Sequence, residues 1–129
     1  MSPSALVIDD DKLLLRLVEL NLAKMGIKVI QADNGKDAIR LALEEKPDLI
    51  LLDIMMPQMD GFEVIRQLKA IRETSSIPVV MLTAKSNPED REKCQELGAV
   101  GYITKPFRLE ELRGLVQRIL QELTPETSG

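Results

Sequence analysis

Five short apolar runs recur along the chain at an even spacing, and a longer segment with helical character follows each of them. The runs cover residues 5–8, 28–32, 49–52, 78–82 and 100–103. Short, nearly continuous apolar runs are typical of strands buried on both faces of a parallel sheet. Because these strands alternate with helices, we expect an α/β fold in which a doubly wound, five-stranded parallel sheet carries five helices in three layers.

Apolar residues recur at the spacing of one helix face in four of the five helical segments. The first segment, residues 12–25, stops at Gly26, while Asn34 can cap the second segment and Pro47 ends it. The residues expected on the buried faces are Leu13, Leu14, Leu17, Val18 and Leu20 or Leu22 in the first helix; Ala38, Ile39, Ala42 and Leu43 in the second; Phe62, Ile65, Leu68 and Ile71 in the third; and Leu109, Leu112, Val116, Ile119 and Leu123 in the last.

The fourth helical segment has a strong start but a poor apolar face. Asn87 can cap it, Pro88 suits its first turn, and two acidic residues follow at the positive end of the helix dipole. Its body offers only Cys94 and Leu97 as apolar anchors. We therefore expect this helix to be weakly buried and locally mobile.

Length and charge limit what the chain can be. The 129 residues, of which 44% are hydrophobic, suffice for one domain, which we place at residues 1–123, with a flexible tail or the start of a linker at 124–129. The net charge of −4 argues against direct binding of nucleic acid. No apolar stretch approaches the roughly 20 residues of a membrane helix, and no signal peptide is readable, so we expect a cytoplasmic protein.

The chain contains no histidine and a single cysteine. The first absence excludes histidine-based catalytic triads, histidine-ligated zinc and phosphohistidine formation within this chain. Cys94 cannot form an internal disulfide and is best interpreted as a small apolar residue of a helix. The candidate chemistry is therefore that of carboxylates, hydroxyls and lysines.

Polar residues stand at the ends of four of the apolar runs. They are Asp9 and Asp10 after the first run, Asp53 after the third, Thr83 after the fourth and Lys105 just behind the fifth. The carboxyl ends of parallel strands lie at one edge of a sheet, where doubly wound folds bind their ligands. Right-handed crossovers allow the first strand to lie between the second and the third, which would bring the three aspartates together.

Three carboxylates in one place need a compensating cation. Two carboxylates about 4 Å apart repel by roughly 4 kcal/mol at an effective dielectric constant of 20. Mg²⁺ prefers oxygen ligands and is commonly completed by a phosphate, so the acidic residues predict a magnesium site. Lys105 can neutralise phosphoryl oxygens, Thr83 can donate a hydrogen bond to one of them, and a carboxylate is the available nucleophile. We choose Asp53 because it lies between the acidic pair and the loop that follows the third run.

Each of these residues also has a simpler interpretation. Residues 9–11 could cap the helix that follows, Asp53 could be a turn residue, and Thr83 could be a cap. Lys105 could be solvated surface, as lone lysines usually are. A shared site is favoured because complementary groups stand at four strand ends on one predicted edge.

From residue 5 to about residue 123, the chain resembles the receiver domain of bacterial two-component response regulators, of the chemotaxis-regulator type. Four motifs in order carry the resemblance: Leu6-Val7-Ile8-Asp9-Asp10-Asp11; Leu51-Leu52-Asp53-Ile54-Met55-Met56-Pro57 followed by Met59-Asp60-Gly61; Val80-Met81-Leu82-Thr83-Ala84; and Gly101-Tyr102-Ile103-Thr104-Lys105-Pro106-Phe107. The resemblance implies the flavodoxin-like strand order 2-1-3-4-5, which chemotaxis regulators share with flavodoxin.

The resemblance also implies a magnesium-dependent phosphoacceptor site. By position, Asp53 is the phosphoacceptor and a metal ligand, and Asp10 is a direct ligand of Mg²⁺. Asp9 is a ligand that acts largely through water, and Met55 is a ligand through its backbone carbonyl. Lys105 is the lysine that pairs with the carboxylate and then with the phosphoryl group.

Further positions resemble the family's switch. Pro106 matches a proline whose preceding peptide bond is usually cis, which would fix the direction of Lys105. Thr83 and Tyr102 match a coupled pair in which the hydroxyl moves toward the phosphoryl group and the ring turns into the vacated space. Ala84 is small enough to permit that movement.

The implied function is that of a response-regulator receiver in a two-component phosphorelay, a signalling domain that assists its own phosphorylation and dephosphorylation rather than an enzyme. A sensor histidine kinase or histidine phosphotransfer protein would donate the phosphoryl group, and a downstream effector protein or a missing output domain would read it. Residues 98–101 lack two acids that many family members use in dimer salt bridges, although Glu111 is retained, so we expect a monomer or a weak phosphorylation-dependent dimer. Met55 and Lys85 match the two positions that, in this family, tune access of water to the acyl phosphate.

Two other classes of protein remain as alternatives. A magnesium-dependent phosphatase with an aspartate nucleophile would usually carry a second aspartate two residues after the first, where this chain has Met55. A flavodoxin-type module would need a phosphate-binding first loop, and residues 9–11 would repel a phosphate. The aromatic content of 2% also leaves little to stack on a flavin.

Overall fold

The computed structural model describes residues 2–56, 60–84 and 87–122. Five parallel strands form one sheet in the order β2-β1-β3-β4-β5. The elements in chain order are β1 (Ser4–Ile8), α1 (Lys12–Ala23), β2 (Lys28–Ala32), α2 (Gly35–Glu45), β3 (Leu49–Asp53), α3 (Gly61–Ala70), β4 (Val79–Thr83), α4 (Pro88–Glu96), β5 (Gly101–Thr104) and α5 (Leu109–Glu122). The predicted doubly wound α/β fold and its strand order are confirmed.

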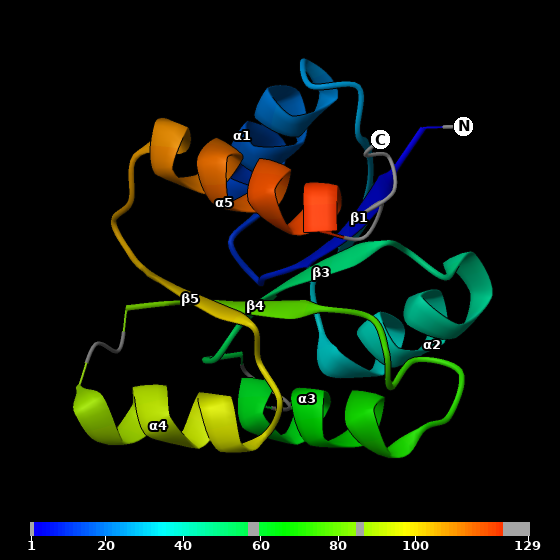
Figure 1. The fold of residues 1–129 in the computed structure, drawn as a ribbon, viewed down its shortest axis with the longest axis vertical. Helices are drawn as coiled ribbons and strands as arrows, with labels where there is room; N and C mark the ends of the chain where they lie inside the picture. Colours follow the sequence, from blue (N-terminus) through cyan, green and yellow to red (C-terminus); the bar gives the residue numbers. More distant parts are fainter. Residues whose placement is uncertain (1, 57–59, 85–86, 123–129) are drawn as a thin grey trace.

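The sheet is the middle of three layers (Figure 1). Helices α1 and α5 cover one face, and α2, α3 and α4 cover the other. Alternate side chains of β1 enter the two cores, since Leu6 and Ile8 pack on one side and Ala5 and Val7 on the other. Because both faces are covered, every residue of β3 and of β4 is buried.

Three strands extend one residue further toward the carboxyl edge than the apolar runs predict. β3 ends at Asp53, β4 at Thr83 and β5 at Thr104. Asp53 is in register with Leu82, and Thr83 is in register with Thr104. A backbone ladder does not depend on side-chain polarity, so the strands continue after the apolar runs have ended. Asp53 and Thr83 are therefore held by the sheet itself.

The buried face of α1 differs from the predicted one. The helix buries Leu15, Val18 and Leu22, whereas its large exposed hydrophobic residues are Leu13, Leu17 and Leu20. The predicted burial of Leu13 and Leu17 is therefore wrong, and Leu15 was missed. Of the alternatives Leu20 and Leu22, Leu22 is the buried residue. The leucines of α1 occur on all sides of the helix, so their spacing alone does not identify the face that packs on the sheet.

A polar residue completes the buried face of α1. Asn21 is buried and donates a hydrogen bond to the carbonyl of Leu17, while its Oδ1 accepts one of 3.0 Å from Arg113 of α5. These two bonds satisfy an amide that would otherwise be costly to bury. The helix ends at Ala23 rather than at residue 25, and the turn that follows contains Gly26 at φ 80°.

The other helices begin largely where the sequence predicts. Asn34 caps α2 and Asn87 caps α4, each by accepting a 2.8 Å hydrogen bond from the backbone N–H three residues later. Of the two predicted anchors of α4, Cys94 is buried and Leu97, which follows the helix, is half-buried, so the expected weak burial is confirmed. Leu43 of α2 is exposed, so its predicted burial is wrong. The buried residues on the remaining predicted faces are Ala38 and Ala42; Phe62, Ile65 and Leu68; and Leu112, Val116 and Ile119.

Some sequence predictions fall outside the described residues. They concern Leu123, the tail at 124–129, Lys85, and Pro57 and Met59 of the loop before α3. Within the described part of the chain, no helix combines the length and the apolar character needed to cross a lipid bilayer.

Candidate functional site

The candidate site lies at the carboxyl edge of the sheet, where β1 and β3 run side by side. Ile8 is in register with Leu52, so Asp9, which follows β1, stands next to Asp53, which ends β3. Asp10 comes directly after Asp9 and precedes α1. The order of the strands thus brings together three acids that are separated by up to 44 positions in the sequence.

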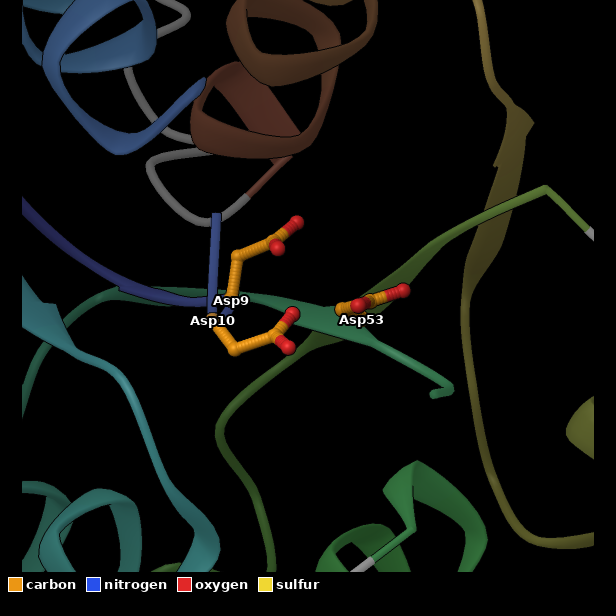
Figure 2. A group of neighbouring side chains, drawn as sticks. All are labelled: Asp9, Asp10 and Asp53. Carbon is orange, nitrogen blue, oxygen red and sulfur yellow. The ribbon is translucent and has the colours of Figure 1, made fainter. Parts of the chain in front are cut away.

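The three carboxylates form a compact group. One oxygen from each of Asp9, Asp10 and Asp53 lies within 4.8 Å of the others. Figure 2 shows all three side chains pointing the same way, away from the ends of β1 and β3. Asp9 and Asp53 are buried, whereas Asp10 is exposed to solvent. The group is therefore open on the side of Asp10 and closed on the side of the sheet.

Both oxygens of Asp9 already accept hydrogen bonds. Oδ1 accepts a 2.9 Å bond from the backbone N–H of Asp11, and Oδ2 accepts a 2.6 Å bond from Nζ of Lys105. Asp11 in turn caps α1 by accepting a bond from the N–H of Leu14. The acidic run therefore combines both roles considered from the sequence, because Asp11 caps the helix while Asp9 and Asp10 join the acidic group.

Lys105 reaches the acidic group from the end of β5. Its backbone N–H donates a 2.7 Å bond to the carbonyl of Thr83, and the peptide bond between Lys105 and Pro106 is cis. Its Nζ lies 2.6 Å from Asp9 Oδ2 and 3.6 Å from Asp53 Oδ1. The lysine thus pairs more closely with Asp9 and stands next to Asp53, which places one ammonium group among three carboxyl groups.

Burial and the nearby negative charge disfavour ionisation of Asp53. Burial raises the pKa of Asp53 from 3.8 to about 6, and the Asp9 carboxylate adds to this rise. Lys105 and the backbone N–H of Met55 lower the pKa but do not cancel the rise. An additional cation at the site would therefore stabilise the ionised carboxylate that a nucleophile requires.

The ligand set fits a hard divalent cation. All of the side-chain donors are carboxylate oxygens, which Mg²⁺ and Ca²⁺ prefer, and one of the three carboxylates faces solvent. An exposed position suits Mg²⁺, which keeps several of its waters. The residues present therefore fit the predicted metal.

The predicted switch residues lie close to this edge. Thr83 is fully buried at the end of β4, and Ala84 directly after it is exposed. Tyr102 is half-buried on β5, in register with Met81, and burial raises the pKa of its hydroxyl. Met55 follows Asp53 by two positions, and 55% of its surface is exposed. All these residues lie on the strands or loops that surround the acidic group.

Gly61 is a site residue that the residue chemistry alone does not reveal. Its N–H donates to the carbonyl of Ile54, and an added Cβ would overlap the backbone of Asp53 and Ile54. Only glycine lets α3 begin so close to the end of β3. A glycine directly after the helix-capping Asp60 was the available signal.

Comparison with known proteins relates the chain to one family. Residues 5–117 match the response regulator receiver domain. The alkaline phosphatase synthesis transcriptional regulatory protein PhoP of Bacillus subtilis (strain 168) is 42% identical over 121 residues, which cover 94% of this chain and 50% of PhoP. The chain therefore spans half the length of this relative.

Solved structures agree with this relationship. Chemotaxis protein CheY4 of Vibrio cholerae is 30% identical with a TM-score of 0.88, over 92% of this chain and 99% of that one. A CheY-like receiver domain protein of Methanospirillum hungatei JF-1 is 25% identical with a TM-score of 0.91, over 98% and 99%. The BeF3-activated DrrB receiver domain is 36% identical with a TM-score of 0.84, over 94% and 99%.

The family match and the geometry concern the same residues. The acidic group and Lys105 lie within residues 5–117, at the carboxyl edge of a sheet with the strand order of the related structures. We conclude that the chain belongs to the receiver domain family of two-component response regulators.

Proposed function

We propose that this domain accepts a phosphoryl group on Asp53 from a phosphohistidine of a partner protein, a sensor histidine kinase or a histidine phosphotransfer protein. The observation that carries the proposal is the environment of the Asp53 carboxylate. Two further carboxylates lie within 4.8 Å of it, and the Lys105 ammonium is 3.6 Å away. This is the charge arrangement that phosphoryl transfer with a divalent cation requires.

The transfer uses the carboxylate of Asp53 as the nucleophile. An Asp53 oxygen forms a bond to phosphorus while the phosphorus–nitrogen bond of the phosphohistidine breaks, and the leaving imidazole takes a proton from solvent. Lys105 stands where its charge can stabilise the phosphoryl oxygens. Water later attacks the phosphorus, which releases inorganic phosphate and restores the carboxylate. The domain thereby limits the lifetime of its own signal.

Asp10, Asp53 and the backbone carbonyl of Met55 are the proposed direct ligands of Mg²⁺, and Asp9 is proposed to act through water. The two hydrogen bonds already accepted by Asp9 support its indirect role, and the exposure of Asp10 supports direct coordination. When bound, Mg²⁺ supplies positive charge that balances the carboxylates and the oxygens of the transferred group.

Phosphorylation adds up to about two negative charges to this edge and is proposed to act on Thr83 and Tyr102. In this proposal the Thr83 hydroxyl moves toward the phosphoryl group, and the Tyr102 ring turns inward past the small Ala84. The burial of Thr83 and the intermediate burial of Tyr102 support such a movement between two packed positions. A downstream protein would read the resulting change of surface.

The exposed leucines of α1 are proposed to contact the phosphoryl donor. Leu13, Leu17 and Leu20 recur at i, i+4 and i+7 and therefore lie on one side of the helix. The helix begins at Lys12, two positions after Asp10, so this stripe starts beside the acidic group. A protein that brings a phosphohistidine to Asp53 has to cover the adjacent surface, and exposed apolar side chains suit such an interface.

The decisive experiment combines the purified protein with acetyl phosphate and Mg²⁺ and locates the adduct by mass spectrometry. We expect a gain of roughly 80 Da, the mass of one phosphoryl group, on the peptide that contains Asp53. The variant Asp53→Asn should gain nothing, and Asp10→Asn should require much more Mg²⁺. A phosphoryl group on another residue, or full labelling of Asp53→Asn, would overturn the proposal.

A second experiment separates chemistry from docking. Leu17→Gln should slow phosphoryl transfer from a protein donor but leave labelling by acetyl phosphate unchanged, because the small donor does not contact α1. Leu43→Gln is the matched control, since this leucine is also exposed but belongs to α2, which covers the other face of the sheet (Figure 1). Equal transfer from the protein donor to the wild type and to Leu17→Gln would show that this stripe is not the docking surface.

A further inference from the structure

Helix α4 has few apolar contacts with the rest of the domain. Cys94 is the one buried residue among its nine, and Leu97, which caps its end, is half-buried. Burial raises the pKa of the Cys94 thiol to about 11, so this residue contributes packing rather than thiolate chemistry. Other contacts must help to determine where the helix lies.

Two basic residues of α4 lie over aromatic rings. The Nζ of Lys93 is 4.2 Å from the centroid of the Phe62 ring, and the Cζ of Arg91 is 4.9 Å from the centroid of the Tyr102 ring. Both distances fall within the range of about 6 Å that is typical of cation–π contacts. Among the residues described, neither Arg91 nor Lys93 forms an ion pair. The ring contacts are therefore the principal polar attachments of these two side chains.

The two contacts lie on different sides of the helix. Positions 91 and 93 are separated by about 200° around the axis of a regular α-helix. Phe62 belongs to α3, and Tyr102 belongs to β5, so each contact joins α4 to a different element. A rotation or a lateral shift of α4 would therefore lengthen at least one of the two contacts.

Both rings are close in the chain to the acidic site. Phe62 directly follows Gly61, which abuts the backbone of Asp53. Tyr102 lies three positions before Lys105 and in the strand that pairs with β4, which ends at Thr83. A movement of either ring would therefore be linked to the residues that surround Asp53.

We propose that Arg91 and Lys93 are positioning residues that hold α4 in place through a two-sided cation–π clamp, and that release of the Arg91 contact frees α4 when Tyr102 moves. The clamp itself is a property of the unphosphorylated domain. Its release rests on the proposed function, because it requires phosphorylation of Asp53. Contacts of this strength suit a switch, since they can be broken by the modest free energies that separate two conformers.

The clamp is tested first without phosphorylation, by amide hydrogen exchange of α4. Arg91→Met and Lys93→Met keep the long side chain and the helix propensity but remove the charge. In each variant we expect the amides of α4 to exchange about two- to fivefold faster than in the wild type. In the double variant the increase should equal the product of the two single increases. Glu92→Gln is the control, because it removes a charge of the opposite sign from an exposed position between the two. The amides of α4 should exchange at the wild-type rate in this variant. Lys93→Arg should keep the wild-type rate, since it retains a cation over Phe62.

Beryllofluoride and Mg²⁺ then test the release. Exchange of α4 in the wild type should rise by about the factor produced by Arg91→Met, and Arg91→Met itself should show little further rise. Wild-type exchange rates in both charge-removal variants would overturn the clamp. An equal response of the wild type and Arg91→Met would overturn its release while leaving the clamp intact. Failure of acetyl phosphate to label Asp53, measured separately, would instead count against the proposed function.

Discussion

Strand β3 and helix α4 are held in the domain in opposite ways. All five residues of β3 are buried, and neighbouring strands pair with it on both sides. Helix α4 buries one of its nine residues and is attached by two contacts between cations and rings. The proposed phosphoacceptor stands at the end of the more constrained element, and the proposed responding helix is the less constrained one.

This difference suggests how one small domain can combine accurate chemistry with a movable surface. A phosphoacceptor needs fixed distances to the proposed metal ligands and to Lys105, and buried parallel strands can provide them. A responding element needs two accessible positions of similar free energy, which a large apolar face would prevent. The contrast between β3 and α4 can be tested by substitutions that act on one and not on the other.

The largest effect is expected in β3. Leu52 is fully buried there, and Leu52→Ala should lower the free energy of unfolding by about 2–5 kcal/mol through loss of apolar contact and creation of a cavity. Leu13→Ala provides the same chemical change at a position that is 79% exposed and should cost less than about 0.5 kcal/mol. Urea unfolding of both variants checks the prediction, and similar losses would mean that β3 is not more constrained than the surface.

The second effect concerns the charge on Asp53. Its pKa is raised from 3.8 to about 6 in the folded protein, so the folded state binds the proton more tightly than the unfolded state does. The resulting stabilisation is complete below about pH 4 and is lost as the pH rises through about 6, a change of about 3 kcal/mol. Asp53→Asn removes this dependence.

The measurement for Asp53 is the difference in unfolding free energy between Asp53→Asn and the wild type, with a chelator present. As the pH rises from about 4 to about 7.5, the unfolding free energy of the variant should increase relative to that of the wild type. Added Mg²⁺ should restore stability to the wild type at the higher pH and should affect the variant less. A difference that does not change with pH would show that Asp53 ionises normally.

A smaller effect separates local from global stability. Asn34 and Asn87 cap α2 and α4 through equal 2.8 Å hydrogen bonds, so either substitution by alanine should cost about 1 kcal/mol of helix stability. For Asn34→Ala the loss should appear in global unfolding, because Ala38 and Ala42 of α2 are fully buried. For Asn87→Ala it should appear mainly as faster amide exchange in α4. Equal global losses would mean that α4 unfolds only with the whole domain.

The smallest effect is expected for charged side chains that touch no ring. Arg40 of α2 lies 3.2 Å from Glu44 and 3.5 Å from Asp37, and all three side chains are exposed. Arg40→Ala should change the unfolding free energy by less than about 0.5 kcal/mol and should leave exchange in α2 almost unchanged. A local loosening as large as that expected for Lys93→Met would show that cation–π contacts are not special in this domain.

The fold could be predicted from the sequence because strands and caps leave local signals. The apolar runs identify all five strands, and Asn34 and Asn87 stand where their helices begin. The strand order required either topological rules or the family resemblance, since no local pattern states which strands pair. The face of α1 could not be predicted because leucines surround it, and burial of Asn21 depends on a hydrogen bond from Arg113 in a distant helix.

The proximity of the acidic residues could be predicted from the sequence, but their individual contacts could not. The polar residues at the strand ends were visible as a set, and the parallel sheet brings Asp9, Asp10 and Asp53 together. The closer pairing of Lys105 with Asp9 depends on how β5 ends, and the ring contacts of α4 depend on how helices pack. Such contacts join residues that are remote in sequence, so periodicity and spacing carry no information about them.

The close approach of Gly61 to β3 has a consequence for sequence variation. The atoms that an added Cβ would meet belong to the main chain of Asp53 and Ile54, so no rearrangement of side chains can make room for it. In a saturation library selected for phosphoryl uptake, position 61 should accept no replacement, even alanine. Position 61 has no side-chain functional group, yet it should tolerate substitution as poorly as position 53, the proposed nucleophile.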